Sequence, residues 1–148
     1  MSRILCLDYG ARRTGVAVSD ETRTIAQSLP TIVCRSEREL ICAVQRLVAD
    51  YAIAEIVLGL PVSLSGKPST RSENVRAFAA RLTRSTGIRV TLFDERLTTA
   101  MARRVLTETQ QRPNQSLKKS HPRSRPRGDA DRIAATIILE DYLARMRS

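Results

Sequence analysis

Three acidic residues stand where apolar segments of the sequence end or begin, and together they could hold a divalent cation. Asp8 follows the apolar run Ile4–Leu7, Glu95 comes soon after the expected strand Ile88–Phe93, and Asp131 lies near the start of a C-terminal helical pattern. If these elements are neighbours, the carboxylates converge, and two like charges about 4 Å apart repel by about 4 kcal/mol at an effective dielectric constant near 20. Such a cluster requires cations, and a ligand set of oxygen atoms alone favours Mg²⁺ or Mn²⁺.

Taken singly, each acid also has a structural explanation. Asp8 could accept a hydrogen bond from the Gly10 amide in a turn, and Glu95 could form an ion pair with Arg96. Asp131 could interact favourably with the dipole at the start of a helix. Only the combination of the three favours a metal site over three unrelated roles.

The stretch around Asp8 predicts a β-hairpin over residues 4–20. The residues before Asp8 are all apolar, which is typical of a central strand covered on both faces. A carboxylate at the end of such a strand must be hydrogen-bonded, neutralised or bound to a cation, and the next basic residue is Arg12. Gly10 and Gly15 bracket the loop, where we expect them to supply the positive φ angles of a tight return.

The elements that must position these acids form an alternating pattern of strands and helices. A capping box at Ser36–Glu39 predicts a helix start, and the same spacing recurs at Thr70 and Glu73. The second helix should end near Gly87. We expect strands at 24–33, 54–60 and 88–93, helices at 36–51, 70–86 and 129–146, and a short helix through Leu106. Pro30 places the first of these strands at a sheet edge or a bend, and the loop 61–69 is a candidate wall of the site.

In the last helix, Asp131 shares a face with the apolar residues. It precedes Ala134, Ala135, Ile138 and Tyr142 by three, four, seven and eleven residues. This spacing predicts that Asp131 projects from the packed side of the helix at its start.

Composition points to one domain over residues 1–148 and to an anionic polymer as partner. The formal charge is +10, from 25 Lys and Arg against 15 acids. The same charge is also consistent with a protein that simply has a basic surface. Aromatic residues make up only 3%, so an aromatic base-stacking surface is disfavoured.

A basic loop occupies about residues 110–128, with six Lys or Arg, three Pro and no acid. It is either a mobile segment that captures phosphates or a solvated linker that contacts nothing. Arg96 likewise suits a phosphate or an ion pair with Asp94. The candidate nucleic-acid-binding residues are Arg13, Lys67, Arg96, Lys118, Lys119, Arg123 and Arg125.

Cysteine and histidine content narrows the chemistry further. Cys6, Cys34 and Cys42 lack CxxC spacing and are typical of reduced core residues in a cytoplasmic protein. His121 is the one histidine, which leaves little for a zinc site or a His-based catalytic triad. The sequence shows neither a signal peptide nor a membrane-spanning segment.

The motifs taken in order closely resemble one family. LDYGxxRxGVAVSD, VLGLP, FAARL, DERLTT and the final DxxAAxxIL are similar to the YqgF (RuvX) family of the RNase H-like superfamily, proposed as Holliday junction resolvases. The resemblance implies an α/β fold with a five-stranded mixed sheet, the first three strands antiparallel and the last two parallel, flanked by helices. It also implies a nuclease acting on Holliday junctions or on the 5′ end of pre-16S rRNA, and maps the family's acids onto Asp8, Glu95 and Asp131.

The leading hypothesis is therefore phosphodiester hydrolysis with two Mg²⁺ or Mn²⁺ ions. Asp8 would bridge the ions and Glu95 and Asp131 would flank them, one ion activating water and the other stabilising the leaving oxygen. Roles for Asp94 and Asp129 as further ligands stay open, as does the choice between DNA junction and precursor rRNA and between monomer and homodimer. The alternatives are a non-catalytic nucleic-acid- or ribosome-associated binding module and, less favoured by chain length, an actin-like ATP-binding fold.

Overall fold

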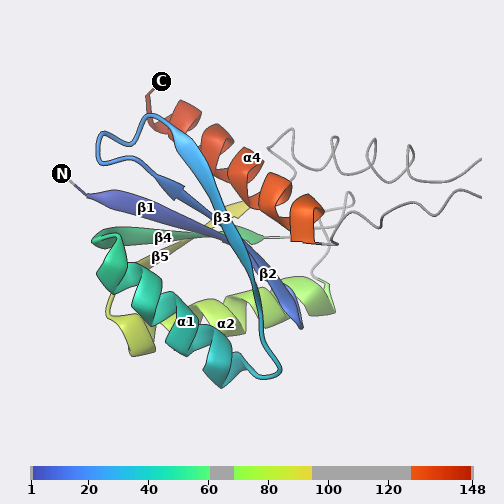
Figure 1. Cartoon of the computed structure of the whole chain (residues 1–148). Helices are drawn as coiled ribbons and strands as arrows, with labels where there is room; N and C mark the ends of the chain where they lie inside the picture. Colours follow the sequence, from blue (N-terminus) through green and yellow to red (C-terminus); the bar gives the residue numbers. More distant parts are fainter. Residues whose placement is uncertain (1, 61–68, 95–127, 148) are drawn as a thin grey trace, which may run out of the picture.

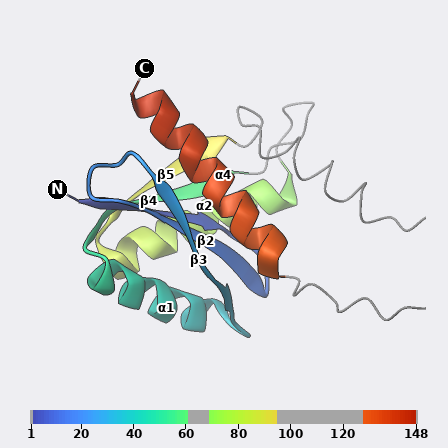
Figure 2. The same cartoon turned by 45° about the horizontal axis from the view of Figure 1, so that its top comes forward.

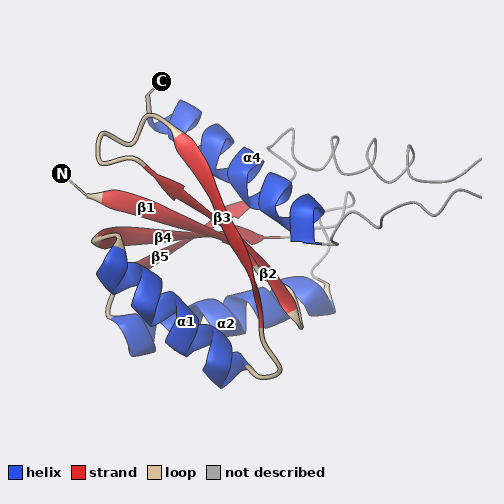
Figure 3. Ribbon diagram, in the orientation of Figure 1, coloured by secondary structure: helices blue, strands red, loops and turns tan. Residues whose placement is uncertain are grey.

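The computed structural model describes residues 2–60, 69–94 and 128–147, with side chains of the last segment described from Ile133 onward. Five strands and three helices lie in this part of the chain (Figure 3). The strands are β1 (Arg3–Asp8), β2 (Arg13–Ser19), β3 (Ala26–Val33), β4 (Ile53–Leu60) and β5 (Arg89–Asp94). The helices are α1 (Glu37–Asp50), α2 (Thr70–Thr86) and α4 (Gly128–Met146). The segments 61–68 and 95–127, which include the expected short helix and nearly all of the basic loop, lie outside the described residues.

The strands form one mixed sheet in the order β3-β2-β1-β4-β5. β1 pairs antiparallel with β2, β2 pairs antiparallel with β3, and the β1–β4 and β4–β5 pairs are parallel. The predicted fold class is thus confirmed, with the strand that ends in Asp8 in the middle of the sheet. Pro30 lies in β3, an edge strand, as expected for a residue that cannot donate a ladder hydrogen bond.

Helices cover both faces of the sheet, α1 and α2 on one side and α4 on the other (Figures 1 and 2). Strand alternation divides the core accordingly. We call the two sides the α1/α2 face, which includes Leu5 and Leu7, and the α4 face, which includes Ile4 and Cys6. All four of these β1 side chains are fully buried, so β1 is covered on both faces as predicted.

The capping residue was predicted correctly for α1 but not for α2. Ser36 caps α1 as predicted, although the Glu39 carboxylate accepts from the Arg35 amide rather than from the cap residue. The cap of α2 was expected at Thr70 but lies at Ser69, which exchanges hydrogen bonds with Ser72. The helix signal was therefore correct and its cap wrong by one residue, because adjacent hydroxyl residues can both serve as caps. Gly87 ends α2 in the left-handed conformation, as predicted.

The cysteines are more varied than expected. All three are free thiols, but only Cys6 is buried, whereas Cys34 is half-buried and Cys42 is exposed on α1. The prediction of three core cysteines is therefore wrong for Cys42, which lies on the outer side of an amphipathic helix. Among the described helices, none is long and apolar enough to cross a membrane.

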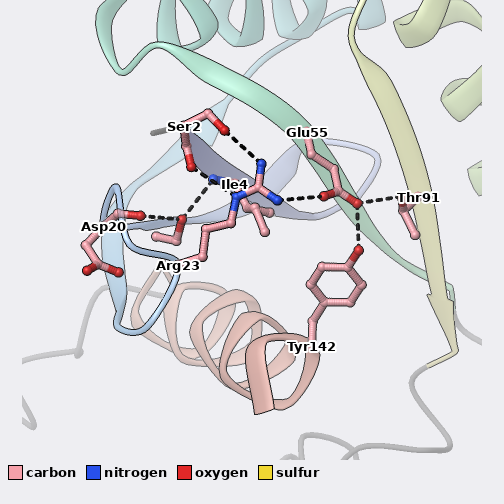
Figure 4. Close-up of polar contacts among 8 residues, drawn as sticks. Ser2, Ile4, Asp20, Arg23, Glu55, Thr91 and Tyr142 are labelled. Atoms are coloured by element: carbon pink, nitrogen blue, oxygen red, sulfur yellow. Dashed lines mark hydrogen bonds and ion pairs between the residues drawn. The ribbon is translucent and has the colours of Figure 1, made fainter. Parts of the chain in front are cut away.

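A buried carboxylate, Glu55 of β4, links four elements on the α4 face at the end of the sheet away from Asp8 (Figure 4). The Thr91 and Tyr142 hydroxyls donate to its Oε1 at 2.8 and 2.6 Å, and Arg23 lies 3.7 Å from its Oε2. Arg23 also donates to Ser2, which ties the β2–β3 loop to the start of the chain. Burial, and then the hydrogen bond to Glu55, raises the pKa of Tyr142, so its hydroxyl stays a donor at neutral pH. The network fixes the C-terminal half of α4 on the sheet.

Replacing Tyr142 by Phe should lower the free energy of unfolding by about 1.5 kcal/mol, because a buried carboxylate loses a hydroxyl donor while the ring stays in place. Urea denaturation measures this change. Tyr51→Phe is the matched control, since the structure gives the Tyr51 hydroxyl no hydrogen bond among the described residues, and it should change stability by less than about 0.5 kcal/mol. Equal effects of the two substitutions would contradict the role given to the Tyr142 hydroxyl.

Candidate active site

Asp8 is the last residue of the middle strand and is only 8% exposed. It pairs with Gly15 of β2, where the β1–β2 ladder ends. Alternation along β1 places Asp8 on the same face as Ile4 and Cys6, which pack against α4. The sequence thus buries a carboxylate at the end of a central strand, on the side that α4 covers.

The carboxyl ends of the parallel strands meet at this edge of the sheet. Leu7 pairs with Leu58 and Leu60 pairs with Asp94, so Asp8 lies within about two residues of the ends of β4 and β5. β4 separates β1 from β5, which puts their backbones about 10 Å apart. α2 and α4, although they lie on opposite faces, both begin at this edge of the sheet (Figure 1). Asp94, the last described residue before Glu95, therefore ends its strand at the same edge as Asp8, two strands away.

Asp94 and Asp8 belong to opposite faces. Phe93 packs in the α4-side core, whereas Val90 and Leu92 pack on the α1/α2 face. Alternation along β5 therefore assigns Asp94 to the α1/α2 face, away from Asp8. This arrangement disfavours Asp94 as a ligand shared with Asp8.

Of the three predicted ligands, Asp8 alone has a described side chain. Glu95 lies outside the described residues, and Asp131 is described only as backbone in the first turn of α4, as is Asp129. Within the described part of the chain, no group of three His, Cys, Asp or Glu residues could hold a metal ion. The described residues therefore contain one of the three predicted ligands, and the triad stays a prediction.

Of the predicted phosphate-binding residues, only Arg13 lies in the described part of the chain. Arg13 begins β2 with an exposed side chain, next to the exposed Arg12 in the hairpin loop. Both arginines lie in the hairpin that connects Asp8 to β2, so the exposed turn between β1 and β2 is basic. The other candidates lie outside the described residues: Lys67, Arg96, Lys118, Lys119, Arg123 and Arg125.

The hairpin loop is tight for a reason that differs from the predicted one. Neither Gly10 nor Gly15 has a positive φ, so that expectation is wrong, and Gly15 lies inside β2. Instead, a Cβ added at Gly10 would overlap the Arg13 carbonyl oxygen, so the loop requires glycine for close approach. The Cys34 amide also donates to the Arg12 carbonyl at 3.0 Å, which joins the loop to the end of β3.

Sequence reasoning passed over Tyr9, although it stands between Asp8 and Gly10. Its half-buried ring packs on the α1/α2 face against Phe78 of α2. Burial and the nearby Glu37 carboxylate raise the pKa of Tyr9, while Arg81 opposes them. The signal that could have revealed it is the period of two along a strand, which sends Asp8 and its neighbour to opposite faces.

This arrangement of strands and helices is shared with two solved resolvases. RuvC of T. thermophilus, solved in complex with a Holliday junction substrate, has a TM-score of 0.56 over 100% of this chain and 98% of that chain, at 13% identity. The Fowlpox virus resolvase, solved with substrate Holliday junction DNA, has a TM-score of 0.57 over 99% of both chains, at 12% identity. At such low identity the similarity establishes the fold alone: the chain has an RNase H-like fold with an acid at the end of its middle strand.

Sequence comparison identifies the family. Residues 2–145 match the RuvX family, described as Holliday junction resolvase, and the chain belongs to this family. Relatives from Koribacter versatilis (strain Ellin345) and Moorella thermoacetica are each 41% identical over 144 residues, or 97% of this chain. The aligned part covers 87% and 96% of those relatives, and both are named "Putative pre-16S rRNA nuclease".

Replacing Gly10 by Ala should lower the free energy of unfolding by about 1 to 3 kcal/mol, because the new methyl group meets a backbone carbonyl that cannot turn aside without moving the loop. Chemical denaturation followed by circular dichroism measures the loss. Ala11→Ser adds a single atom at the exposed neighbouring position and should stay within about 0.5 kcal/mol of wild type. A Gly10→Ala protein as stable as the Ala11→Ser protein would show that the loop has room to spare.

Proposed function

We propose that this protein is a divalent-metal-dependent endonuclease that hydrolyses phosphodiester bonds in structured nucleic acid, with the 5′ end of pre-16S rRNA as its substrate. The observation that carries the proposal is the buried Asp8 carboxylate at the end of the middle strand, on the face covered by α4. This is the edge at which α/β sheets place their ligands, and a buried ionisable group at such a position is a candidate for a functional site.

Glu95 and Asp131 complete the proposed ligand set. Phe93 of β5 packs on the α4 face, and Glu95 follows Phe93 by two residues in the sequence. Asp131 lies in the first turn of α4, the helix that packs on this face. The three acids would thus come from β1, the end of β5 and α4.

Element lengths support the place of Asp131. Tyr142 donates to Glu55, which is level with Ile4 in the β1–β4 ladder. Asp131 lies eleven residues before Tyr142, a rise of about 16 Å along a helix. Asp8 lies four residues after Ile4, about 13 Å along a strand. Since α4 begins at the edge where β1 ends and runs from there toward Glu55, these lengths bring its first turn to the level of Asp8 (Figure 1).

The donor set fits Mg²⁺ or Mn²⁺, because all three groups are carboxylates and at least Asp8 is withdrawn from bulk water. When bound, such ions lower the pKa of water and stabilise negative charge on the phosphoryl oxygens. The chain itself supplies the ligands and, through the exposed Arg12 and Arg13, positive charge for the phosphates beside the scissile bond. The net charge of +10 favours capture of the polyanion as a whole.

The relatives favour precursor rRNA as the substrate. Proteins 41% identical over nearly the whole chain are named for pre-16S rRNA, whereas the junction-bound structures are only 12 to 13% identical. A four-way DNA junction is the second candidate, since the family is described as Holliday junction resolvase.

Replacing Asp8 by Asn should reduce Mg²⁺-dependent cleavage by at least about 100-fold, the scale on which loss of one electrostatic stabiliser lowers kcat. The assay compares 5′-extended 16S precursor, a linear duplex and a four-way DNA junction, each with Mg²⁺ or with EDTA. Asp50→Asn is the matched control, because Asp50 is an exposed acid at the end of α1, and its cleavage rate should equal that of wild type.

The outcomes separate the alternatives. Cleavage that survives Asp8→Asn or EDTA would overturn the proposed site. Salt-sensitive binding by wild type without cutting any of the three substrates would instead identify a binding module. Preferential cutting of the four-way junction would replace precursor rRNA as the substrate while leaving the chemistry intact.

A further inference from the structure

We propose that Tyr9 is a positioning residue for the active site, and that its ring, stacked on Phe78 of α2, holds the Asp8 carboxylate in place for metal binding. This inference rests on the proposed function. In this proposal Tyr9 contacts neither metal nor substrate and keeps the neighbouring carboxylate in position.

Asp8 needs support because it stands where the strand pairing stops. Asp8↔Gly15 is the last pair of the β1–β2 ladder, and the pairing of β1 with β4 ends one residue earlier, at Leu7↔Leu58. The backbone beyond Asp8 is therefore without a ladder hydrogen bond, and strand ends of this kind fray. Metal ligands must be held within about 0.5 Å of their working positions. Something other than the sheet must fix the chain directly after Asp8.

The Tyr9 ring meets this need. Its centroid lies 4.3 Å from that of Phe78, with the two planes only 14° apart. The Phe78 side chain is fully buried, and the surrounding core restricts its movement. An aromatic pair in this geometry contributes about 0.5 to 1.5 kcal/mol beyond its buried area. Because Asp8 and Tyr9 project from opposite faces, a shift of Asp8 toward α4 would pull the Tyr9 ring away from Phe78.

An ion pair between α1 and α2 lies near the Tyr9 ring on the α1/α2 face. Arg81 of α2 forms a two-pronged ion pair with Glu37 of α1, with both nitrogen–oxygen distances 2.6 Å. Both groups lie close enough to Tyr9 to act on its hydroxyl electrostatically. This pair joins the first turn of α1 to the middle of α2, so the surface on which Tyr9 rests is itself braced.

The chain on the far side of Tyr9 is also fixed. Gly10 approaches the Arg13 carbonyl too closely for any Cβ, and the Arg12 carbonyl accepts from the Cys34 amide. Tyr9 is thus the one large side chain between the last paired residue and this rigid loop. The stack therefore transmits the position of α2 to Asp8.

The test compares Tyr9→Phe, Tyr9→Leu and a matched control, Tyr51→Leu. Tyr51 is a half-buried tyrosine packed on the same core cluster, but it follows α1 and lies beside Arg3, at the other end of β1 from Asp8. Cleavage of the precursor and binding of Mn²⁺ to the protein, followed by electron paramagnetic resonance, are measured well below the melting temperature of each variant. Mn²⁺ binding gives a readout that does not depend on turnover.

Tyr9→Phe keeps the stacked ring and should stay within about 3-fold of wild type in kcat and in Mn²⁺ affinity. Tyr9→Leu keeps an apolar side chain but loses the stack, and should lower kcat and Mn²⁺ affinity by about 10- to 100-fold with KM for nucleic acid little changed. Tyr51→Leu should change neither. Phe78→Leu, which removes the other ring without altering the hairpin, should reproduce the Tyr9→Leu pattern and serves if Tyr9→Leu does not fold.

Failure of this proposal is distinct from failure of the proposed function. If wild type cleaves, Asp8→Asn does not, and Tyr9→Leu or Phe78→Leu behaves like Tyr51→Leu, the positioning role is overturned while the nuclease stands. A Tyr9→Phe protein as impaired as Tyr9→Leu would also overturn it, because the stack would then not be the operative contact. Cleavage unaffected by Asp8→Asn would refute the proposed function itself.

Discussion

Burial of the Asp8 carboxylate is the constraint around which this fold is arranged. A charge withdrawn from water at the end of an apolar strand costs several kcal/mol unless its surroundings compensate it. The α4 face carries a second buried acid, Glu55, about four residues away along the strands, where two hydroxyls and an arginine surround it within the protein. Asp8, which is equally buried at 8% exposure, lies where strands end and helices begin, and this is the edge at which α/β sheets place ligands. The two acids thus differ in their position along the sheet and not in burial.

The period of two along β1 places the proposed metal ligand and its neighbour on opposite faces of the sheet. Asp8 lies on the face covered by α4, and Tyr9 lies on the face covered by α1 and α2. A catalytic side chain can therefore be anchored through the backbone by its own neighbour without that neighbour entering the site. This division follows from strand geometry alone, and it explains why a central strand with both faces buried suits a carboxylate that must not move.

Local patterns predicted most of the fold, because hydrophobic periodicity and the left-handed glycine at 87 act over a few residues. Three features escaped prediction because each depends on the folded geometry or on a choice that the local pattern leaves open. The need for Gly10 comes from the Arg13 carbonyl, the Glu55 network unites elements up to 87 residues apart, and the cap of α2 was a choice between adjacent hydroxyls. Of the site, the sequence identified Asp8 correctly as the acid of a buried central strand, whereas its convergence with Glu95 and Asp131 was implied by family resemblance.

The Glu55 network also bears on how α4 finds its place. The sheet-facing side of α4 is apolar, including Ala135, Ile138 and Leu139, and apolar contacts are not directional. Packing alone would tolerate a helix displaced along its axis or rotated by part of a turn. The Tyr142 hydroxyl, however, reaches Glu55 in only one register, so a displaced helix would leave a buried carboxylate short of a donor. Because a helix is rigid over three turns, fixing Tyr142 also fixes where the backbone of Asp131 lies. The polar network at one end of the sheet thus helps to position the start of α4 at the other end, where the proposed site lies.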